Sequence, residues 1–313
     1  MVPTKPQQVA ADAALLFVAF VWGVTFVVVK EALTEIGPYY FLAIRFAIAF
    51  AFLALICWRS LLRVNRENMQ AGLIIGLALF GGYAFQTVGL QYTTAANAGF
   101  ITGLSVVLVP LFVAALTRRV PSPMAILGVA CATVGLGLLA LNGDLRVGYG
   151  DALVFCCAVC FATHIILVGK YAPRLDPVLL AIVQIGTVGL VSALIAPVLE
   201  SFPVTLAPQV QVALLATAIP ATSLAFLIQN KAQKFTSPTH TAVIFTMEPV
   251  FAGLAAWLWG GEVLELRQWI GGAVIVAGML ITVLKTSEPL LAPKPALVPV
   301  SKGQNVAPPH NRC

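Results

Sequence analysis

The feature that most constrains the fold of this chain is a series of apolar stretches, each about 20 residues long, with almost no charge inside them. An α-helix of roughly 20 apolar residues crosses a bilayer core about 30 Å thick. Ten such stretches follow one another along the 313 residues: 12–29, 38–58, 71–90, 95–116, 124–141, 151–169, 177–199, 210–229, 238–259 and 266–284. The sequence therefore predicts an all-α integral membrane protein with ten transmembrane helices.

The composition excludes other classes of protein. Only 10% of the residues are charged, whereas a soluble domain carries about a quarter. The net charge of +6 comes from short clusters of Lys and Arg between the apolar stretches, so no nucleic-acid partner is predicted. Most cysteines lie inside apolar stretches, where a thiol behaves as a small hydrophobic group rather than as part of a disulfide framework.

The distribution of basic residues predicts the orientation in the membrane. If the amino terminus is cytoplasmic, most of the 18 Lys and Arg residues fall on the cytoplasmic side. Both termini of this multi-pass protein are therefore expected in the cytoplasm, with the chain in the inner (plasma) membrane. The first stretch lacks a cleavage signature and is expected to be retained. Residues 287–313 are Pro-rich and lack a helical period, which predicts a disordered cytoplasmic tail.

The chain also contains an internal repeat. A shift of 143 residues lays Thr93 on Thr236 and Gly128 on Gly271, and a shift of 139 residues lays Asp12 on Asp151. Each half holds five apolar stretches, an odd number, so the halves must enter the membrane from opposite sides. We therefore divide the chain into a first repeat, 1–145, and a second repeat of inverted topology, 146–286.

Two turns support the inverted arrangement through their charges. The turn after the fourth stretch carries Arg118 and Arg119, whereas the turn after the ninth carries Glu262, Glu265 and only one basic residue, Arg267. Because basic residues favour the cytoplasmic side, these equivalent turns are expected on opposite faces of the membrane.

Short motifs lie in a fixed order along residues 12–284: Phe20-Val-Trp22-Gly23-Val-Thr25-Phe26, Arg45-Phe46, the stretch from Tyr92-Thr93-Thr94 to Phe100, Gly150-Asp151-Ala152-Leu153, Met247-Glu248-Pro249-Val250-Phe251, Gly261-Glu262 and Gln268-Trp269-Ile270-Gly271. In this order and spacing they resemble the EamA-type transporters of the drug/metabolite transporter superfamily. The resemblance implies a ten-helix carrier that works by alternating access around a central cavity. It implies transport of amino acids, other metabolites or drug-like compounds, often outward.

The two halves differ at the positions that this resemblance places in the cavity. The second half has Phe161-Ala162 where the first has Trp22-Gly23, and His164 stands where the first half has Thr25. The cavity is therefore expected to be asymmetric.

Two charged residues lie clearly within apolar stretches, Arg45 and Glu248. Such a residue costs about 2.5 to 3.5 kcal/mol on insertion scales, so both should face protein or water. Glu248 is predicted either to load a proton or pair with a cationic group of the solute, or to serve a structural role beside Pro249. Arg45 is predicted either to bind a solute carboxylate through its fork of donors, or to pair with Glu248, or to reach the membrane interface.

Other polar residues within the apolar stretches complete the predicted solute-binding set. Each could supply a donor or acceptor in a largely apolar pocket, or could hydrogen-bond one helix to another. These residues are Trp22, Thr25, Tyr83, Gln86, Thr102, His164 and Gln184. With three histidines and no His-x-x-x-His spacing, the sequence predicts neither a metal site nor another cofactor.

Prolines and glycines indicate where helices bend and where they approach closely. Pro110, Pro220 and Pro249 each remove a backbone hydrogen bond within an apolar stretch, which predicts kinks or hinges. Glycines in the fifth and tenth stretches predict close helix packing, in a structural or dimer-forming role: Gly128, Gly135, Gly137, Gly271, Gly272 and Gly278.

Taken together, these features favour a secondary transporter that exports a small organic solute, with proton exchange at Glu248 as an option. An intramembrane lipid enzyme is a rival class, but it needs a nucleophile–base or metal constellation, and no such motif occurs in the sequence. A non-transporting receptor or scaffold is a third class, for which charges in the membrane would bring no benefit. The expected partners are the solute and the lipid bilayer, and a homodimer is left open.

Overall fold

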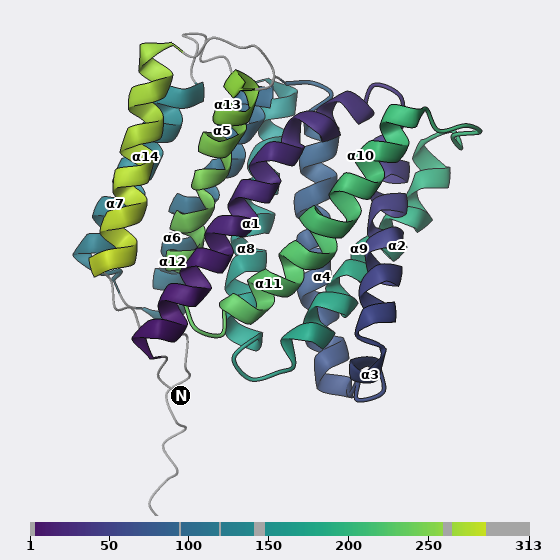
Figure 1. Ribbon diagram of the computed structural model, residues 1–313, viewed down its shortest axis with the longest axis horizontal. Helices are drawn as coiled ribbons and strands as arrows, with labels where there is room; N and C mark the ends of the chain where they lie inside the picture. The colour runs from purple at the N-terminus through teal and green to yellow at the C-terminus, as the bar shows by residue number, and fades with distance from the viewer. Residues whose placement is uncertain (1–3, 94, 119, 141–147, 259–264, 286–313) are drawn as a thin grey trace, which may run out of the picture.

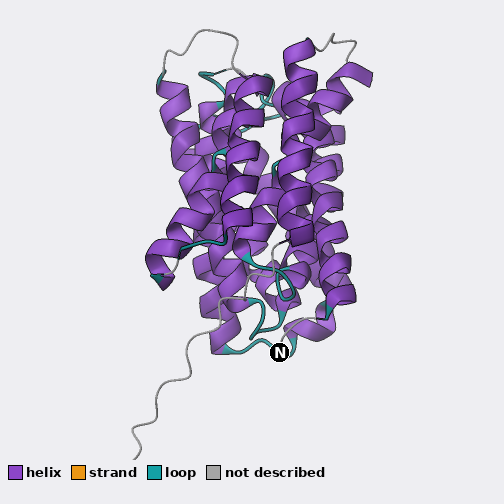
Figure 2. Cartoon of the chain, turned by 90° about the vertical axis from the view of Figure 1, so that its left-hand side faces the viewer, coloured by secondary structure: helices purple, strands orange, loops and turns teal. Residues whose placement is uncertain are grey.

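The computed structural model describes residues 4–93, 95–118, 120–140, 148–258 and 265–285. Within these ranges the chain forms helices and turns and no strand, which confirms the all-α prediction. Figure 2 shows the helices running lengthwise through a bundle, with connections at its two ends. The elements are α1 (Lys5–Ala32), α2 (Pro38–Ile56), α3 (Trp58–Leu61), α4 (Arg66–Gly89), α5 (Ala95–Gly103), α6 (Ser105–Thr117), α7 (Pro123–Ala140), α8 (Tyr149–Tyr171), α9 (Pro177–Leu199), α10 (Pro208–Ala218), the π-helix η1 (Ile219–Leu224), α11 (Ala225–Ala232), α12 (Pro238–Phe245), α13 (Met247–Leu258) and α14 (Leu266–Lys285).

The helices have the length and composition of a multi-pass membrane protein. Among the described residues, six are long and apolar enough to cross a bilayer: Lys5–Ala32, Pro38–Ile56, Arg66–Gly89, Tyr149–Tyr171, Pro177–Leu199 and Pro208–Ala232. Large apolar side chains such as Leu55 and Val198 are 76% and 79% exposed, as expected for a surface that faces lipid. The predicted tail, 287–313, and the turn residues Arg119 and Glu262 lie outside the described residues.

Helix α4 is packed closely against α8 and α9. Its glycines allow this approach, because a Cβ added at Gly76 would lie 2.6 Å from the Cβ of Thr187, and one at Gly72 would lie 2.5 Å from that of Val183. Helix α2 packs on the same helix α9. These four helices therefore form one block, which carries Arg45 on α2 and Tyr83 on α4.

Helices α7 and α14 pack side by side at one edge of the bundle (Figure 1). A Cβ added at Gly135 would lie 2.6 Å from the carbonyl oxygen of Gly271, and one at Gly278 would lie 2.8 Å from that of Gly128. Close packing through these glycines was predicted from the sequence and is confirmed.

Two of the predicted apolar stretches are each divided into two helices. The stretch 95–116 is interrupted at Leu104, between α5 and α6, and the stretch 238–259 at Thr246, between α12 and α13. The shift of 143 residues brings these two breaks within one residue of each other. Pro249 follows the second break directly, where its missing N–H leaves no donor for the preceding turn. By contrast, Pro110 lies inside the continuous helix α6.

The start of α2 is held by an acidic residue that follows α9. The two carboxylate oxygens of Glu200 accept hydrogen bonds from the backbone N–H groups of Tyr39 (2.8 Å) and Tyr40 (2.9 Å). Gly37 leaves room for this carboxylate, since a Cβ there would lie 2.3 Å from Oε2 of Glu200. A negative charge at a helix N-terminus is favourable, so this contact fixes the position of α2 and of Arg45 within it.

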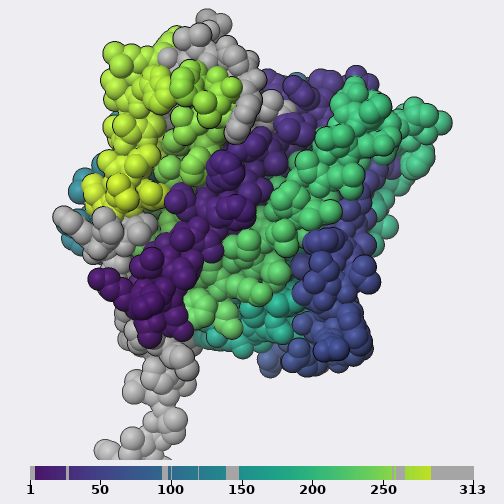
Figure 3. Space-filling model, in the orientation of Figure 1, coloured from purple at the N-terminus to yellow at the C-terminus, as the bar shows by residue number. Residues whose placement is uncertain are grey.

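Helix α1 crosses one face of the bundle diagonally (Figure 3). It packs on α13 and α11. The approach is closest at Gly23, where a Cβ would lie 2.5 Å from the carbonyl oxygen of Glu248. Trp22 is thereby placed beside the break between α12 and α13.

Candidate functional site

The site is built around the π-helix η1, which interrupts the helix formed by α10 and α11. Pro220 near its start lacks an N–H, so the α-helical pattern cannot continue unchanged. The hydroxyl of Thr222 donates to the carbonyl of Thr217 (2.9 Å), and that of Ser223 is within 2.9 Å of the carbonyl of Ala218 and 3.0 Å of that of Ala49 on α2. These hydroxyls pair with backbone carbonyls of the wider π-helical turn and connect the turn to α2. Such π-bulges are frequent at functional sites.

Arg45 is directed into this region and is only 4% exposed. Its Nε donates to the hydroxyl of Thr222 (2.8 Å), and its Nη2 lies 3.5 Å from both the hydroxyl of Tyr83 and the carbonyl oxygen of Ala221. The guanidinium also lies over the ring of Tyr83, 5.1 Å from its centroid. Among the described residues, no acidic side chain forms an ion pair with Arg45. Its surroundings are neutral oxygens and aromatic faces.

Aromatic rings close one side of the arginine site. The indole N–H of Trp22 donates to the carbonyl of Ala221 (2.8 Å), the same carbonyl that Arg45 approaches. The Trp22 ring packs on Phe245 and Phe226, with centroid separations of 5.0 and 5.6 Å. Residues from α1, α11 and α12 therefore meet at η1.

His164 and Gln184 form a buried pair next to these rings. Their Nε2 and Oε1 atoms are 2.7 Å apart, and the imidazole packs edge-on against Phe226 at 5.8 Å. The Nε2 of Gln184 has no hydrogen-bond partner in the described part of the chain. Because an unpaired buried donor is unfavourable, this amide is a candidate to bind a solute acceptor.

A second polar group joins α4, α5 and α8. The amide of Gln86 donates to the hydroxyl of Thr102 (3.3 Å), which is also 3.8 Å from the sulfur of Cys157. Tyr83, one turn before Gln86 on α4, connects this group to Arg45.

Glu248 occupies the first turn of α13, directly after the helix break at Thr246. The residue is half-buried, and its carboxylate is close enough to Tyr83 and Cys157 to interact with them electrostatically. Over the described ranges, no hydrogen-bond donor or cation is paired with this carboxylate. The structure thus places both Arg45 and Glu248 near Tyr83, and the two form no ion pair with each other.

The structure therefore brings together eight of the nine residues predicted to bind a solute. Among the described residues, Thr25 has no side-chain contact with this group, because its hydroxyl donates to the carbonyls of Val21 (2.8 Å) and Trp22 (3.1 Å) within its own helix. Solute binding by all nine stays a prediction. Sequence reasoning missed Thr222 and the carbonyl of Ala221, although a proline followed by Thr222-Ser223 in an apolar stretch could have indicated them.

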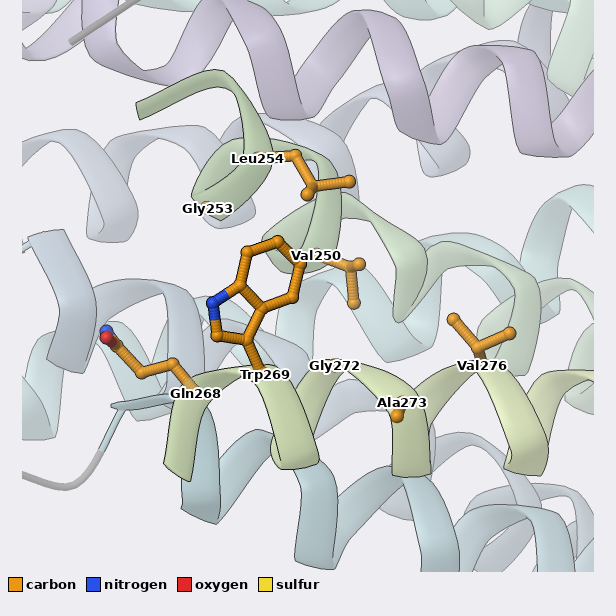
Figure 4. A pocket seen from close by; sticks show the side chains of 8 residues that line it. All are labelled: Val250, Gly253, Leu254, Gln268, Trp269, Gly272, Ala273 and Val276. Atoms are coloured by element: carbon orange, nitrogen blue, oxygen red, sulfur yellow. The ribbon is translucent and has the colours of Figure 1, made fainter. Parts of the chain in front are cut away.

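In the described ranges, no group of three or more His, Cys, Asp or Glu side chains could hold a metal ion. A groove of about 260 Å³ lies between α13 and α14, where the ring of Trp269 extends toward α13 (Figure 4). Its lining is almost wholly apolar and includes none of the nine predicted residues: Val250, Gly253, Leu254, Gln268, Trp269, Gly272, Ala273 and Val276.

Comparison with known proteins gives consistent matches over most of the chain. The EamA-like transporter family matches residues 9–141 and again residues 148–284. An uncharacterized transporter of Archaeoglobus fulgidus is 36% identical over 279 residues, which cover 89% of this chain and 87% of that protein. The uncharacterized transporter YyaM of Bacillus subtilis is 25% identical over 271 residues, covering 82% of this chain and 88% of YyaM. One crystal structure has a similar fold, with a TM-score of 0.73 at 22% identity over 88% of this chain and 97% of the other.

Proposed function

The chain belongs to the EamA-like transporter family, and from this premise we propose that it is a secondary transporter of a small organic solute. It carries the solute across the cytoplasmic membrane by alternating access. Transporter-named relatives that match most of the chain weigh against the two rival classes, an intramembrane lipid enzyme and a non-transporting scaffold or receptor.

The proposed architecture is two five-helix halves of inverted topology, 1–145 and 146–286, with ten membrane crossings and both termini in the cytoplasm. Three observations support it. The family matches the chain twice in succession. The helix breaks at Leu104 and Thr246 fall in equivalent positions of the two matches. In Figure 1, α5 and α13 lie toward one end of the bundle while α6 and α12 lie toward the other, as antiparallel halves require.

The observation that best supports this function is that Arg45 is buried and has no acidic partner among the described residues. A buried charge is strongly unfavourable unless it is compensated. Neutral oxygens of Thr222 and Tyr83 hold the guanidinium in place but bring no negative charge. A solute carboxylate would supply that charge, and the planar fork of donors on arginine suits it.

Glu248 and the aromatic rings narrow the class of solute. The carboxylate of Glu248 is unpaired over the described ranges and lies in electrostatic range of Tyr83, which also contacts Arg45. A solute with a carboxylate at one end and an ammonium group at the other would pair with both charges. The rings of Trp22 and Phe226 would pack on its apolar part. We therefore favour amino acids and related carboxylates.

We propose that proton movement drives solute transport and that Glu248 is the residue that exchanges the proton. A half-buried carboxylate that can alternate between a proton and a solute ammonium group would couple the two movements. Outward transport is proposed from the family resemblance.

The test compares the medium of cells that produce the wild-type protein, Arg45→Gln or Arg59→Gln. Arg59 is the matched control, because it is a surface arginine that lies over the ring of Trp58. We expect the wild type and Arg59→Gln to enrich the medium in solutes that bear a carboxylate, and Arg45→Gln not to do so. Enrichment in cations without a carboxylate, or equal export by Arg45→Gln, would contradict the proposal.

A further inference from the structure

A second pair of ionisable residues lies toward the N-terminal end of α1. Asp12 on α1 and His240 on α12 approach to 3.4 Å between Oδ2 and Nε2. Both residues are buried, with exposures of 8% and 1%. Asp12 belongs to the first family match and His240 to the second, so the pair joins the two halves.

The surroundings of this pair are polar and incompletely bonded. Within the described ranges, Oδ1 of Asp12 and Nε2 of His240 have no hydrogen-bond partner, and neither do Oε1 of Gln229 and Oγ1 of Thr236. Three of these four atoms belong to residues 229–240, and native proteins rarely leave so many buried polar atoms of one segment unpaired. Few hydrogen bonds would be broken if the helices in this region separated, as expected where a transport pathway closes and opens.

The pair lies at one end of helix α8. A Cβ added at Gly169, near the C-terminus of α8, would lie 2.7 Å from Cγ of Pro238, the first residue of α12. The amide of Gln233 donates to the carbonyl of Ile165 (3.0 Å) at the same end. His240 therefore lies in the first turn of α12, where α12 packs on the end of α8.

The other end of α8 carries an equivalent contact. The hydroxyl of Thr93 donates to Oδ1 of Asp151 (2.5 Å), and a Cβ added at Gly150 would lie 2.9 Å from the backbone N of Thr93. Along a helix at 1.5 Å per residue, residues 151 and 169 are about 27 Å apart. The repeat lays Asp12 on Asp151, but it lays Thr93 on Thr236, four residues before His240, so the two aspartates are equivalent and their partners lie about one helical turn apart in the repeat.

The two ends therefore share one arrangement but differ in chemistry. At each end, an aspartate near the start of one half meets the start of a broken helix of the other half. Asp12 faces an imidazole, whose charge changes between about pH 5 and 8 in its ordinary state. Asp151 faces the hydroxyl of Thr93, which does not titrate.

We propose that Asp12 and His240 form a proton-dependent latch that closes the cytoplasmic end of the transport pathway, with Thr93 and Asp151 as its pH-independent counterpart at the outer end. This inference rests on the proposed function, in which the two ends open alternately. A protonated His240 attracts ionised Asp12 and holds α1 against α12. When the proton leaves, Asp12 is a buried carboxylate without a counter-ion, and separation of the two helices is favoured.

Other titratable and charged groups on the elements around the pair do not provide an equivalent contact. None of those with described side chains forms an ion pair with Asp12 or His240. His164 is bonded to Gln184 and Glu248 lies at the helix break, whereas the cations near this end are on the surface or partly exposed. The groups are Lys5 on α1, Arg118 after α6, Cys131 on α7, His164 and Lys170 on α8, Lys231 on α11, Lys234 after it, and Glu248 on α13.

The test measures the distance between α1 and the end of α11 as the pH changes. Spin labels are placed at Val9 and Lys231, both exposed near this end, in the full chain with its six native cysteines replaced by alanine. Double electron–electron resonance is recorded in lipid nanodiscs at about pH 5.5 and about pH 8, on either side of the usual histidine range. We expect the ratio of the shorter to the longer distance to be at least about fivefold higher at the lower pH, a typical coupling between two sites.

The variants assign the response to the pair. His240→Gln and Asp12→Asn should each give the same distance distribution at both pH values. Two variants are used so that poor folding of one of them does not decide the result. Lys5→Gln on α1 and Lys170→Gln on α8 remove exposed charges near the same end, so they are the controls and should keep the wild-type response. A wild type that does not respond to pH, or a response that persists in His240→Gln, overturns the latch. Neither result bears on carboxylate export, which is measured separately, so the latch and the proposed function can fail independently.

Discussion

Arg45 and Glu248 are both charged residues in apolar helices, yet their surroundings differ. Arg45 is almost fully buried and is held by Thr222, Tyr83 and the carbonyl of Ala221. Glu248 is half-buried, begins a short helix and has no paired donor among the described residues. The first charge is fixed before any solute arrives, whereas the second can change its partner.

This difference indicates separate roles, with solute binding at Arg45 and proton coupling at Glu248. A preorganised guanidinium loses little conformational entropy on binding, which favours selectivity and affinity. A carboxylate without a fixed partner can exchange a proton for a cationic group, which favours coupling. Substitutions at Arg45 and its support should therefore affect solute affinity, and substitutions at Glu248 should affect proton movement.

The largest effect is expected from Arg45→Lys. Lysine keeps the charge but lacks the planar fork that reaches Thr222, Tyr83 and a carboxylate together. A hydrogen bond that involves a charged group is worth about 1.5 to 3 kcal/mol, and lysine loses more than one of them, so KM for the carboxylate solute should rise by at least about 30-fold. The measurement is the KM for uptake into proteoliposomes, and a lysine variant with wild-type KM would show that the fork is not used.

A smaller effect on affinity is expected from Thr222→Val, which removes the oxygen that accepts from Nε of Arg45. An unsatisfied buried donor costs about 1 to 3 kcal/mol, so KM should rise by roughly tenfold. Ser223→Ala is the matched control, because the hydroxyl of Ser223 bonds to the carbonyls of Ala218 and Ala49 and not to Arg45. The control should lower thermal stability and leave KM unchanged. Equal changes of KM in both variants would indicate a general effect of η1.

Glu248→Gln should have a modest effect on folding and a specific effect on coupling. The amide has the shape of the carboxylate, and no described partner of Glu248 would be left unpaired. We expect solute exchange to continue with a raised KM for solutes that bear an ammonium group, while solute-driven proton movement falls below detection, since an amide does not take up a proton. A pH-sensitive dye inside sealed vesicles measures the proton movement. Wild-type proton movement in this variant would assign coupling elsewhere.

The smallest effect is expected from Glu200→Gln, outside the site. The change weakens the cap at the start of α2, and the free energy of unfolding should fall by about 1 kcal/mol. Glu35→Gln, an exposed residue in the turn before α2, is the control and should leave stability unchanged. Thermal unfolding in detergent measures both. A large change of solute selectivity in Glu200→Gln would show that the cap does more than position α2.

The sequence predicted where helices form, because the ten apolar stretches fall mainly on helix within the described ranges. Six of the described helices are long and apolar enough to cross a membrane, so the count of ten crossings stays a prediction. The sequence also singled out Arg45 and Glu248, since charge in such a stretch is rare. It could not predict that Thr222 would accept from Arg45, because that contact joins residues 177 positions apart. It could not predict either that the hydroxyl of Thr25 would donate within its own helix, an option open to any threonine in an apolar helix.

The central claim is that Arg45 binds the carboxylate of the transported solute. The most direct test is the uptake of L-phenylalanine, phenylacetate and 2-phenylethylamine into proteoliposomes, because these probes share a ring and differ in their charged groups. The wild type should carry the two carboxylates and not the amine, and Arg45→Gln should carry none of the three. Uptake of the amine at the rate of the acids, or uptake of the acids by Arg45→Gln at the wild-type rate, would contradict the claim.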